Sequence, residues 1–223
     1  MANLIKFIHD NPTIFAAALF GAVAAIFVRV GIRLVQFIWL RYCVRWTNYD
    51  CSLSIHREGI LHHAMGESVS DNKASNRNAW RYPANQDVLT GQVKEGGVIH
   101  GPYTNDFGKP GYYKARFEVR SRGLNKANRT LPMLQLEVVD SRPELAGANW
   151  ITRTTEVGQR LLTEATLFRA KEYRKYDITF YSNGNGRYEY RAAILEKSWL
   201  AGKEIYFDRI RVRPWMFVRE IFS

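Results

Sequence analysis

Cysteine is scarce in this chain of 223 residues, which has only Cys43 and Cys51. Two cysteines cannot build the disulfide framework of a small secreted domain, and they cannot form a zinc site with four cysteine ligands. This scarcity fits a reducing compartment. We expect no bound metal and no cofactor.

Signatures of catalysis are missing as well. The chain has no H-E-x-x-H, no G-x-S-x-G and no phosphate-binding G-x-x-x-x-G-K-[ST] motif. His62 and His63 are adjacent, and Glu137 and Asp140 are three apart, so alternation along a strand places each pair on opposite faces. Asp208 could be a calcium ligand, but pairing with an arginine or fixing a turn is the better interpretation. We therefore expect a protein that is not an enzyme.

Charge is absent from residues 12–28, a run of 17 residues. A helix rises about 1.5 Å per residue, so the run covers roughly 26 Å, near the lower limit for crossing a bilayer. Asp10 or Asn11 can cap this helix, and Pro12 suits its first turn. A cleaved signal peptide would have its charge before the apolar run, and a soluble core helix rarely lacks charge for this long. The pattern predicts one transmembrane helix.

Basic residues follow the apolar run, whereas only Lys6, beside Asp10, precedes it. Lysine and arginine resist translocation, so the charge rule predicts an outside amino terminus and a cytoplasmic β-domain at a bacterial-type inner membrane. The residues predicted to lie at the membrane interface are Arg29, Arg33, Trp39, Arg41, Arg45 and Trp46.

Small residues recur on the predicted helix, and Ala17, Gly21, Ala24 and Ala25 would permit close packing against other transmembrane subunits. The chain is also strongly basic, with a formal net charge of +11. Attraction to anionic headgroups is a sufficient reason for this charge. We expect no nucleic-acid partner, because no basic run, zinc-ligand set or RNA-binding aromatic motif is present.

Segments that alternate apolar and polar residues recur after residue 97, and each is a predicted strand. They are residues 111–121, 131–140, 160–168, 175–181, 187–195 and 204–214. Asn183-Gly184-Asn185-Gly186 is a tight-turn signal and predicts a hairpin between the strands on either side. Residues 63–97 are polar and irregular, with Trp80 and Tyr82 as apolar anchors, and predict a long loop. A further short strand is expected around Leu53 and Ile55.

These patterns predict a mainly β fold, an antiparallel β-sandwich of the jelly-roll kind, on one N-terminal transmembrane helix. We divide the chain into residues 1–46 with the helix and a basic stem, a connecting segment 47–96, the sandwich 97–214 and an apolar tail 215–223.

Four motifs resemble jelly-roll modules of the galactose-binding-like and carbohydrate-binding type. They are Gly101-Pro102-Tyr103, the strand from Pro110-Gly111-Tyr112 through Phe117 and Val119, Glu189-Tyr190-Arg191 in the penultimate strand, and the strand from Phe207-Asp208 to Pro214. The resemblance covers about residues 97–214, and it implies a fold rather than a ligand.

Aromatic residues provide two hints of binding. Tyr103, Tyr112, Tyr181, Trp150 and Trp199 could stack on sugar rings, although core packing is the more ordinary role. The tail ends in apolar and aromatic residues, and we predict partner docking by Trp215, Met216, Phe217 and Phe222.

Two functional hypotheses follow. The first is a non-catalytic accessory subunit that packs its helix in a larger membrane complex, such as a respiratory or photosynthetic one, and braces its cytoplasmic face. The alternative is a membrane-tethered carbohydrate-binding module in envelope polysaccharide synthesis. Their partners are other transmembrane subunits and the lipid bilayer in the first case, and carbohydrate in the second.

Both hypotheses need an integral membrane anchor. We therefore expect the full chain to stay in the vesicle pellet after alkaline carbonate extraction, because burial of the uncharged run in lipid does not depend on surface charge. Release of intact chain into the supernatant would contradict the anchor.

Overall fold

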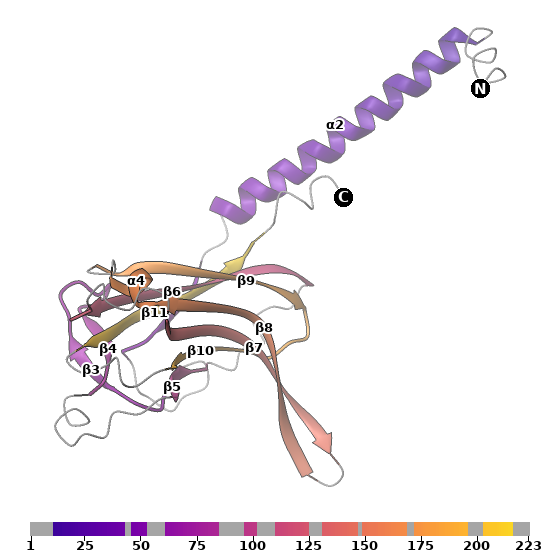
Figure 1. Ribbon diagram of the computed structural model, residues 1–223. Helices are drawn as coiled ribbons and strands as arrows, with labels where there is room; N and C mark the ends of the chain where they lie inside the picture. The colour runs from indigo at the N-terminus through magenta and orange to yellow at the C-terminus, as the bar shows by residue number, and fades with distance from the viewer. Residues whose placement is uncertain are drawn as a thin grey trace. The chain divides into compact units, whose positions relative to one another are not determined.

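A computed structural model describes residues 11–42, 46–52, 61–84, 96–101, 110–124, 131–146, 149–168, 172–195 and 203–215. The chain separates into two units, one with Met1–Val44 and Met216–Ser223 and the other with Arg45–Trp215. Among the described residues, the first unit contains helix α2 and the second contains the strands and helix α4 (Figure 1).

The helix, α2, runs from Pro12 to Tyr42 over 31 residues. Its segment Pro12–Val35 is 24 residues long and has no buried residue in its most apolar window. At about 1.5 Å per residue this segment covers roughly 36 Å, more than the bilayer core requires. By length and composition α2 can cross a membrane, although an N-terminal signal sequence has the same features.

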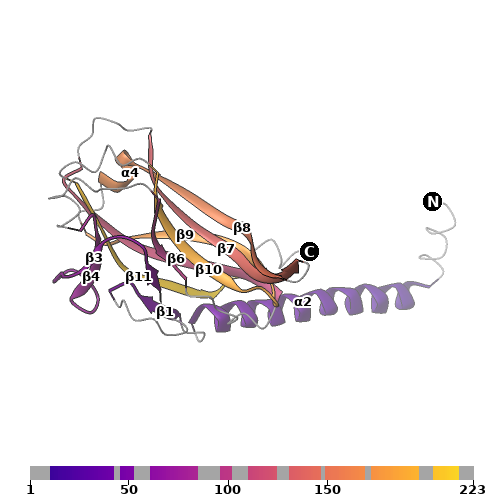
Figure 2. The same ribbon diagram turned by 90° about the horizontal axis from the view of Figure 1, so that it is seen from below.

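The strands form two antiparallel sheets (Figure 1, Figure 2). Sheet A has the order β3-β4-β11-β6-β9, and β1 also pairs with β11. Its strands are β1 Thr47–Asp50, β3 Glu67–Ser70, β4 Asn78–Tyr82, β6 Pro110–Arg122, β9 Arg174–Asn183 and β11 Glu204–Pro214. Sheet B has the order β2-β5-β10-β7-β8. Its strands are β2 His62–His63, β5 Gly96–His100, β7 Pro132–Ala146, β8 Asn149–Thr163 and β10 Tyr188–Ile194.

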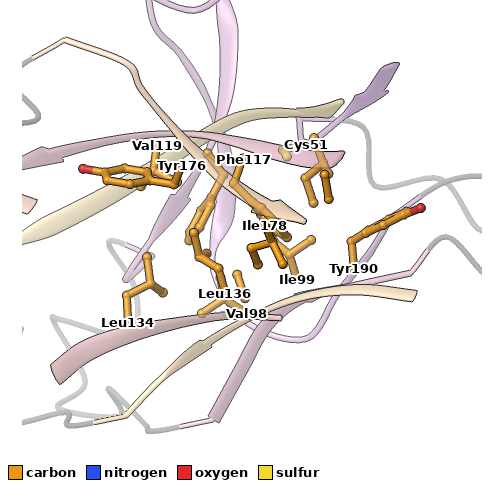
Figure 3. Close-up of a cluster of buried hydrophobic side chains, with 14 of the residues drawn as sticks. Cys51, Val98, Ile99, Phe117, Val119, Leu134, Leu136, Tyr176, Ile178 and Tyr190 are labelled. Carbon is orange, nitrogen blue, oxygen red and sulfur yellow. The ribbon is translucent and has the colours of Figure 1, made fainter. Parts of the chain in front are cut away.

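The hydrophobic core lies between the two sheets (Figure 3). Sheet A contributes Phe117 and Ile178, and sheet B contributes Leu136 and Ile99, each at most 4% exposed. The predicted alternation along β6 is confirmed, because Tyr113, Ala115, Phe117 and Val119 are all buried. The predicted antiparallel β-sandwich is therefore confirmed.

The predicted hairpin around residues 183–186 is wrong. Gly184 has the positive φ of 84° that a turn requires, but β9 pairs with β6 in sheet A, whereas β10 pairs with β5 and β7 in sheet B. The turn carries the chain from one sheet to the other. A turn motif specifies local backbone geometry, and it does not specify which strands exchange hydrogen bonds.

The expected loop at residues 63–97 contains β3 and β4, and Trp80 and Tyr82 are buried in it as anchors. These strands are only 4 and 5 residues long, so alternation was too brief to reveal them. The strand expected at 160–168 ends at Thr163, and helix α4 takes up Glu164–Phe168. Thr163 Oγ1 accepts a hydrogen bond from the Thr166 amide (3.3 Å), which is the N-cap arrangement that starts a helix. The strand expected around Leu53 and Ile55 lies outside the described residues.

Gly158 lets the edges of the two sheets approach closely. A Cβ atom at Gly158 of β8 would lie 2.7 Å from Ile178 Cγ2 of β9, which is too close for an unstrained contact. At Gly97 of β5, by contrast, a Cβ atom would have no neighbour within 4 Å.

Gly158→Ala should therefore lower the free energy of unfolding by about 1–3 kcal/mol, the usual cost of overpacking a core. Gly97→Ala is the matched control in the same sheet and should change it by less than about 0.5 kcal/mol. Chemical denaturation in detergent micelles, followed by tryptophan fluorescence, measures both. Equal effects of the two substitutions would contradict the close approach.

Candidate binding surface on sheet B

Strand register places four residues in one row across the outer face of sheet B. Leu161 pairs with Gln135, Gln135 with Ala193, and Ala193 with Gly97. The side chains shorten along this row from Gln135 through Ala193 to Gly97. At its β5 end the row forms a bare floor, by which we mean that a Cβ atom added at Gly97 would meet no atom of the described residues within 4 Å.

A second row of polar side chains lies beside this floor. Gln159 pairs with Glu137, and Glu137 pairs with Arg191. Gln135 Nε2 donates a hydrogen bond to Glu137 Oε2 at 2.8 Å, and Arg191 Nη1 lies 3.7 Å from Glu137 Oε1. These contacts fix the orientation of the amide, the carboxylate and the guanidinium group before any ligand arrives. We call Gln135, Glu137, Gln159, Arg191, Ala193 and Gly97 together the sheet B surface.

Glu189 lies two residues from Arg191 on the same outer face of β10, but it is only 1% exposed. Arg191 Nη2 donates to its carboxylate at 2.7 Å, Ser141 Oγ donates at 3.1 Å, and His100 Nδ1 lies 3.5 Å away. Burial alone would raise the pKa of Glu189, but the hydrogen bonds from His100, Arg191 and Ser141 and the charge of Arg191 outweigh it. The pKa is lowered from 4.5 to about 2, so the carboxylate stays ionised and holds Arg191 in place.

The sheet B surface suits a ligand that offers hydroxyl groups. Its carboxylate only accepts hydrogen bonds, its guanidinium group only donates them, and its amides do both. Among the described residues, no group of three or more His, Cys, Asp or Glu side chains could hold a metal ion.

The acidic residues singled out in the sequence do not come together. Glu137 belongs to the sheet B surface, whereas Asp140 accepts hydrogen bonds from Arg142 and from the Arg187 amide. Asp208 accepts hydrogen bonds from the amide (3.1 Å) and hydroxyl (2.7 Å) of Ser75, so it fixes the turn between β3 and β4 as expected. Burial raises the pKa of this carboxyl group.

Of the aromatic residues predicted to stack on sugar rings, two lie on sheet A. Tyr112 and Tyr181 meet edge to face on the outer face of sheet A, with ring centroids 5.2 Å apart, and Tyr181 is 51% exposed. Trp150 belongs to β8. Trp46 and Trp215 lie beside basic residues of sheet A. Tyr103 and Trp199 lie outside the described residues, as do Arg45, Met216, Phe217 and Phe222.

The residues predicted to pack or anchor the helix are on α2. Ala17, Gly21, Ala24 and Ala25 are exposed along it, and Arg29, Arg33, Trp39 and Arg41 follow on the same helix. Their roles in helix packing and at the membrane interface stay predictions, as does the division of the chain into segments.

Sequence reasoning missed Gln135, Arg191, Gly97 and Glu189. Alternation indicates that Gln135 and Arg191 face outward, but it cannot indicate that they meet across a strand pair. Only the register of β7 against β10 brings them together.

No known protein family matches the sequence, and no curated protein matches it. Several solved structures have a similar arrangement. A xylan-binding domain from Paenibacillus barcinonensis is 9% identical, with a TM-score of 0.44 over 76% of this chain and 99% of that one. The adhesin domain of Lys-gingipain from Porphyromonas gingivalis is 9% identical, with a TM-score of 0.43 over 78% and 100%.

An endo-1,4-beta-D-xylanase of Clostridium thermocellum, solved with its carbohydrate-binding module, is 10% identical with a TM-score of 0.39. The match covers 77% of this chain and only 26% of the xylanase. Carbohydrate-binding modules are thus among the similar structures, the same class that the sequence resembles. Because each TM-score is below 0.5, the function proposed below rests on the residues of this chain.

The low pKa of Glu189 makes stability depend on pH. Its value of about 2 in the folded chain lies below its ordinary value of 4.5. The ionised Glu189 therefore adds about 3 kcal/mol to the free energy of unfolding. This stabilisation is fully present above pH 4.5 and is lost as the pH falls toward 2. Glu189→Gln mimics the protonated acid. Denaturation curves of the two chains should differ by this amount near neutral pH and converge toward pH 2. A difference that stays constant with pH would contradict the ionised, bonded carboxylate.

Proposed function

We propose that the chain is a single-pass membrane protein whose β-sandwich binds carbohydrate, without catalysis, on the sheet B surface. Two features support the two parts of this proposal. The length and composition of α2 support the anchor. The row of oriented amide, carboxylate and guanidinium groups beside a bare floor supports the binding surface, and it is the observation that carries the proposal.

The surface extends across four strands, from β8 to β5. Neighbouring strands are about 4.8 Å apart, so the row spans on the order of 14 Å. That length exceeds a single sugar ring and is open toward solvent along Gly97 and Ala193. The geometry favours a stretch of oligosaccharide laid across the strands over an isolated monosaccharide.

The charges favour a neutral carbohydrate. Glu137 and Glu189 are two carboxylates, and Arg191 contacts both of them. A uronic acid or sulfated sugar would bring further negative charge against these carboxylates, and like charges repel at close range. Neutral hydroxyl groups meet no such repulsion.

The proposal includes the absence of catalysis because of the ionisation of Glu189 and the hydrogen-bond contacts of Glu137. A glycosidase needs a carboxylic acid that can deliver a proton to the leaving oxygen. Glu189, with a pKa of about 2, stays ionised at neutral pH, is 1% exposed and accepts a hydrogen bond from Arg191. The oxygens of Glu137 are turned to Gln135 and Arg191. Both groups are arranged to accept hydrogen bonds and to orient a neighbour.

This proposal adopts the second of the two sequence hypotheses. The sheet B surface favours it, whereas a role as accessory subunit of a membrane complex depends on the helix alone. The cytoplasmic position of the sandwich stays a prediction from the charge rule.

An array of neutral and uronic-acid oligosaccharides, probed with the full chain in detergent micelles, identifies the ligand class. We expect binding to neutral oligosaccharides and weak or no binding to the uronic acids. Failure to bind any oligosaccharide would overturn the proposal.

Substitutions then locate the site by calorimetric titration with the tightest oligosaccharide. Gly97→Phe should abolish binding, because it fills the bare floor without touching any hydrogen-bonding group. Glu137→Ala should weaken binding roughly 10- to 100-fold, since hydrogen bonds to charged groups contribute about 1.5–3 kcal/mol. Thr179→Ala, on the outer face of sheet A, is the control and should leave the affinity unchanged. Unchanged affinity in Gly97→Phe would exclude this surface.

A further inference from the structure

The outer face of sheet A carries a cluster of bases and aromatic rings. Alternation along β6 and β11 directs Lys114, Arg116, Arg211 and Arg213 to this face, opposite the buried Tyr113, Ala115, Phe117, Ile210 and Val212. These bases are largely covered there, because the side chains of Lys114, Arg211 and Arg116 are 13%, 16% and 21% exposed and Arg213 is 9% exposed. Tryptophans flank the cluster at both ends of the sandwich unit, Trp46 just before β1 and Trp215 just after β11. We call Trp46, Lys114, Arg116, Arg211, Arg213 and Trp215 the sheet A surface.

The two tryptophans are held by cations. The Trp46 ring centroid lies 4.3 Å from the guanidinium carbon of Arg213, 4.7 Å from that of Arg116 and 5.4 Å from that of Arg211. Lys114 Nζ lies 3.4 Å from the Trp215 ring centroid, and the Trp215 amide donates to the Tyr112 carbonyl oxygen at 2.7 Å. Contacts of this kind attract the cation to the face of the ring.

The cluster carries more positive than negative charge. Asp177 forms ion pairs with both Arg116 (Nε to Oδ1 2.7 Å) and Lys114 (Nζ to Oδ2 3.3 Å). Glu118 forms ion pairs with Arg211 and with Arg209. Among the described residues, these two carboxylates face the four bases of the sheet A surface and Arg209, so basic side chains outnumber acidic ones there. Tyr112 and Tyr181 continue the surface, and Tyr181 is half exposed.

We propose that the sheet A surface docks on anionic phospholipid headgroups. Tryptophan and tyrosine favour the headgroup region of a bilayer, and clustered bases attract phosphate there. Only residues 43–45 separate helix α2 from Trp46, so this is the part of the sandwich that follows the anchor in the sequence. The inference is independent of the carbohydrate proposal, because it concerns the opposite face of the sandwich.

Docking would also determine which outer face of the sandwich remains accessible to a ligand. The two sheets pack through their inner faces, so their outer faces point in opposite directions. With the sheet A surface on the headgroups, the sheet B surface is directed away from the bilayer.

Fluorescence quenching in nanodiscs tests the docking on the full chain. In a Cys43→Ser background, which leaves only the buried Cys51, a fluorophore is attached either at Thr179→Cys or at Gln159→Cys. Thr179 pairs with Lys114 on the outer face of sheet A, and Gln159 lies on the sheet B surface. The quencher is a spin label on the lipid headgroup.

We expect quenching several-fold stronger at position 179 than at position 159 in nanodiscs that contain phosphatidylglycerol. Nanodiscs of phosphatidylcholine alone should reduce the difference. Raising the ionic strength from about 0.1 M to about 1 M should reduce it too, because the screening length falls from roughly 10 Å to roughly 3 Å.

Two substitutions test whether docking depends on the sheet A surface or only on the total charge of the chain. Lys114→Gln should lower quenching at position 179, whereas Lys73→Gln, which removes an equal charge from the turn between β3 and β4, should not. The salt dependence is measured without the Lys114 and Lys73 substitutions, so it tests the docking even if one of these variants misfolds. Equal quenching at both positions, or quenching that ignores phosphatidylglycerol and salt, would overturn the docking, whatever the outcome with oligosaccharides.

Discussion

The packing of large apolar side chains between two sheets determines which residues of each strand face outward in the sandwich. Strands of period two can bury only alternate residues, so each strand that fills the core also commits its other residues to an outer face. Phe117 and Val119 on β6 are buried at the core, and Arg116 between Ala115 and Phe117 is thereby directed outward. The same rule on β7 buries Leu136 and directs Gln135 and Glu137 outward. One constraint thus generates a core and two chemically different surfaces.

Two buried carboxylates, Asp71 and Asp208, fix the turn between β3 and β4 by hydrogen bonds. Asp71 is 7% exposed and accepts hydrogen bonds from Arg120 Nη2 and the Tyr173 hydroxyl, each at 2.7 Å, and from the Lys73 amide. It joins the turn after β3 to β6 and to the start of β9. Asp208 does the same for the other side of that turn through Ser75. Buried carboxylates of this kind are costly unless they are bonded, so they favour a single arrangement of the turn.

The fold could be predicted largely from sequence because parts of its long strands alternate regularly. β9 alternates from Tyr176 onward, β6 alternates from Tyr113 to Phe117, and the inward positions Ile210 and Val212 of β11 agree with the expectation. The hairpin at Asn183 was wrong because turn chemistry is local, while pairing depends on which sheet buries each strand. β3 and β4 were missed because strands of 4 and 5 residues leave little periodicity to detect. The sheet B surface could not be predicted for a further reason, since Gly97, Ala193 and Gln135 are distant in sequence and meet only through register.

The proposed anchor and the proposed carbohydrate surface together have a consequence for how tightly a polymer would be held. If α2 crosses a bilayer, as its length and composition allow, the sandwich is confined to two dimensions, so neighbouring copies present an array rather than a scattered population. A long chain that lies across several copies rebinds at one before it has left the others, and its effective local concentration is set by their spacing. Each contact can then be weak and quickly exchanged while the polymer as a whole stays attached. In such an arrangement avidity, rather than the strength of any single contact, decides retention.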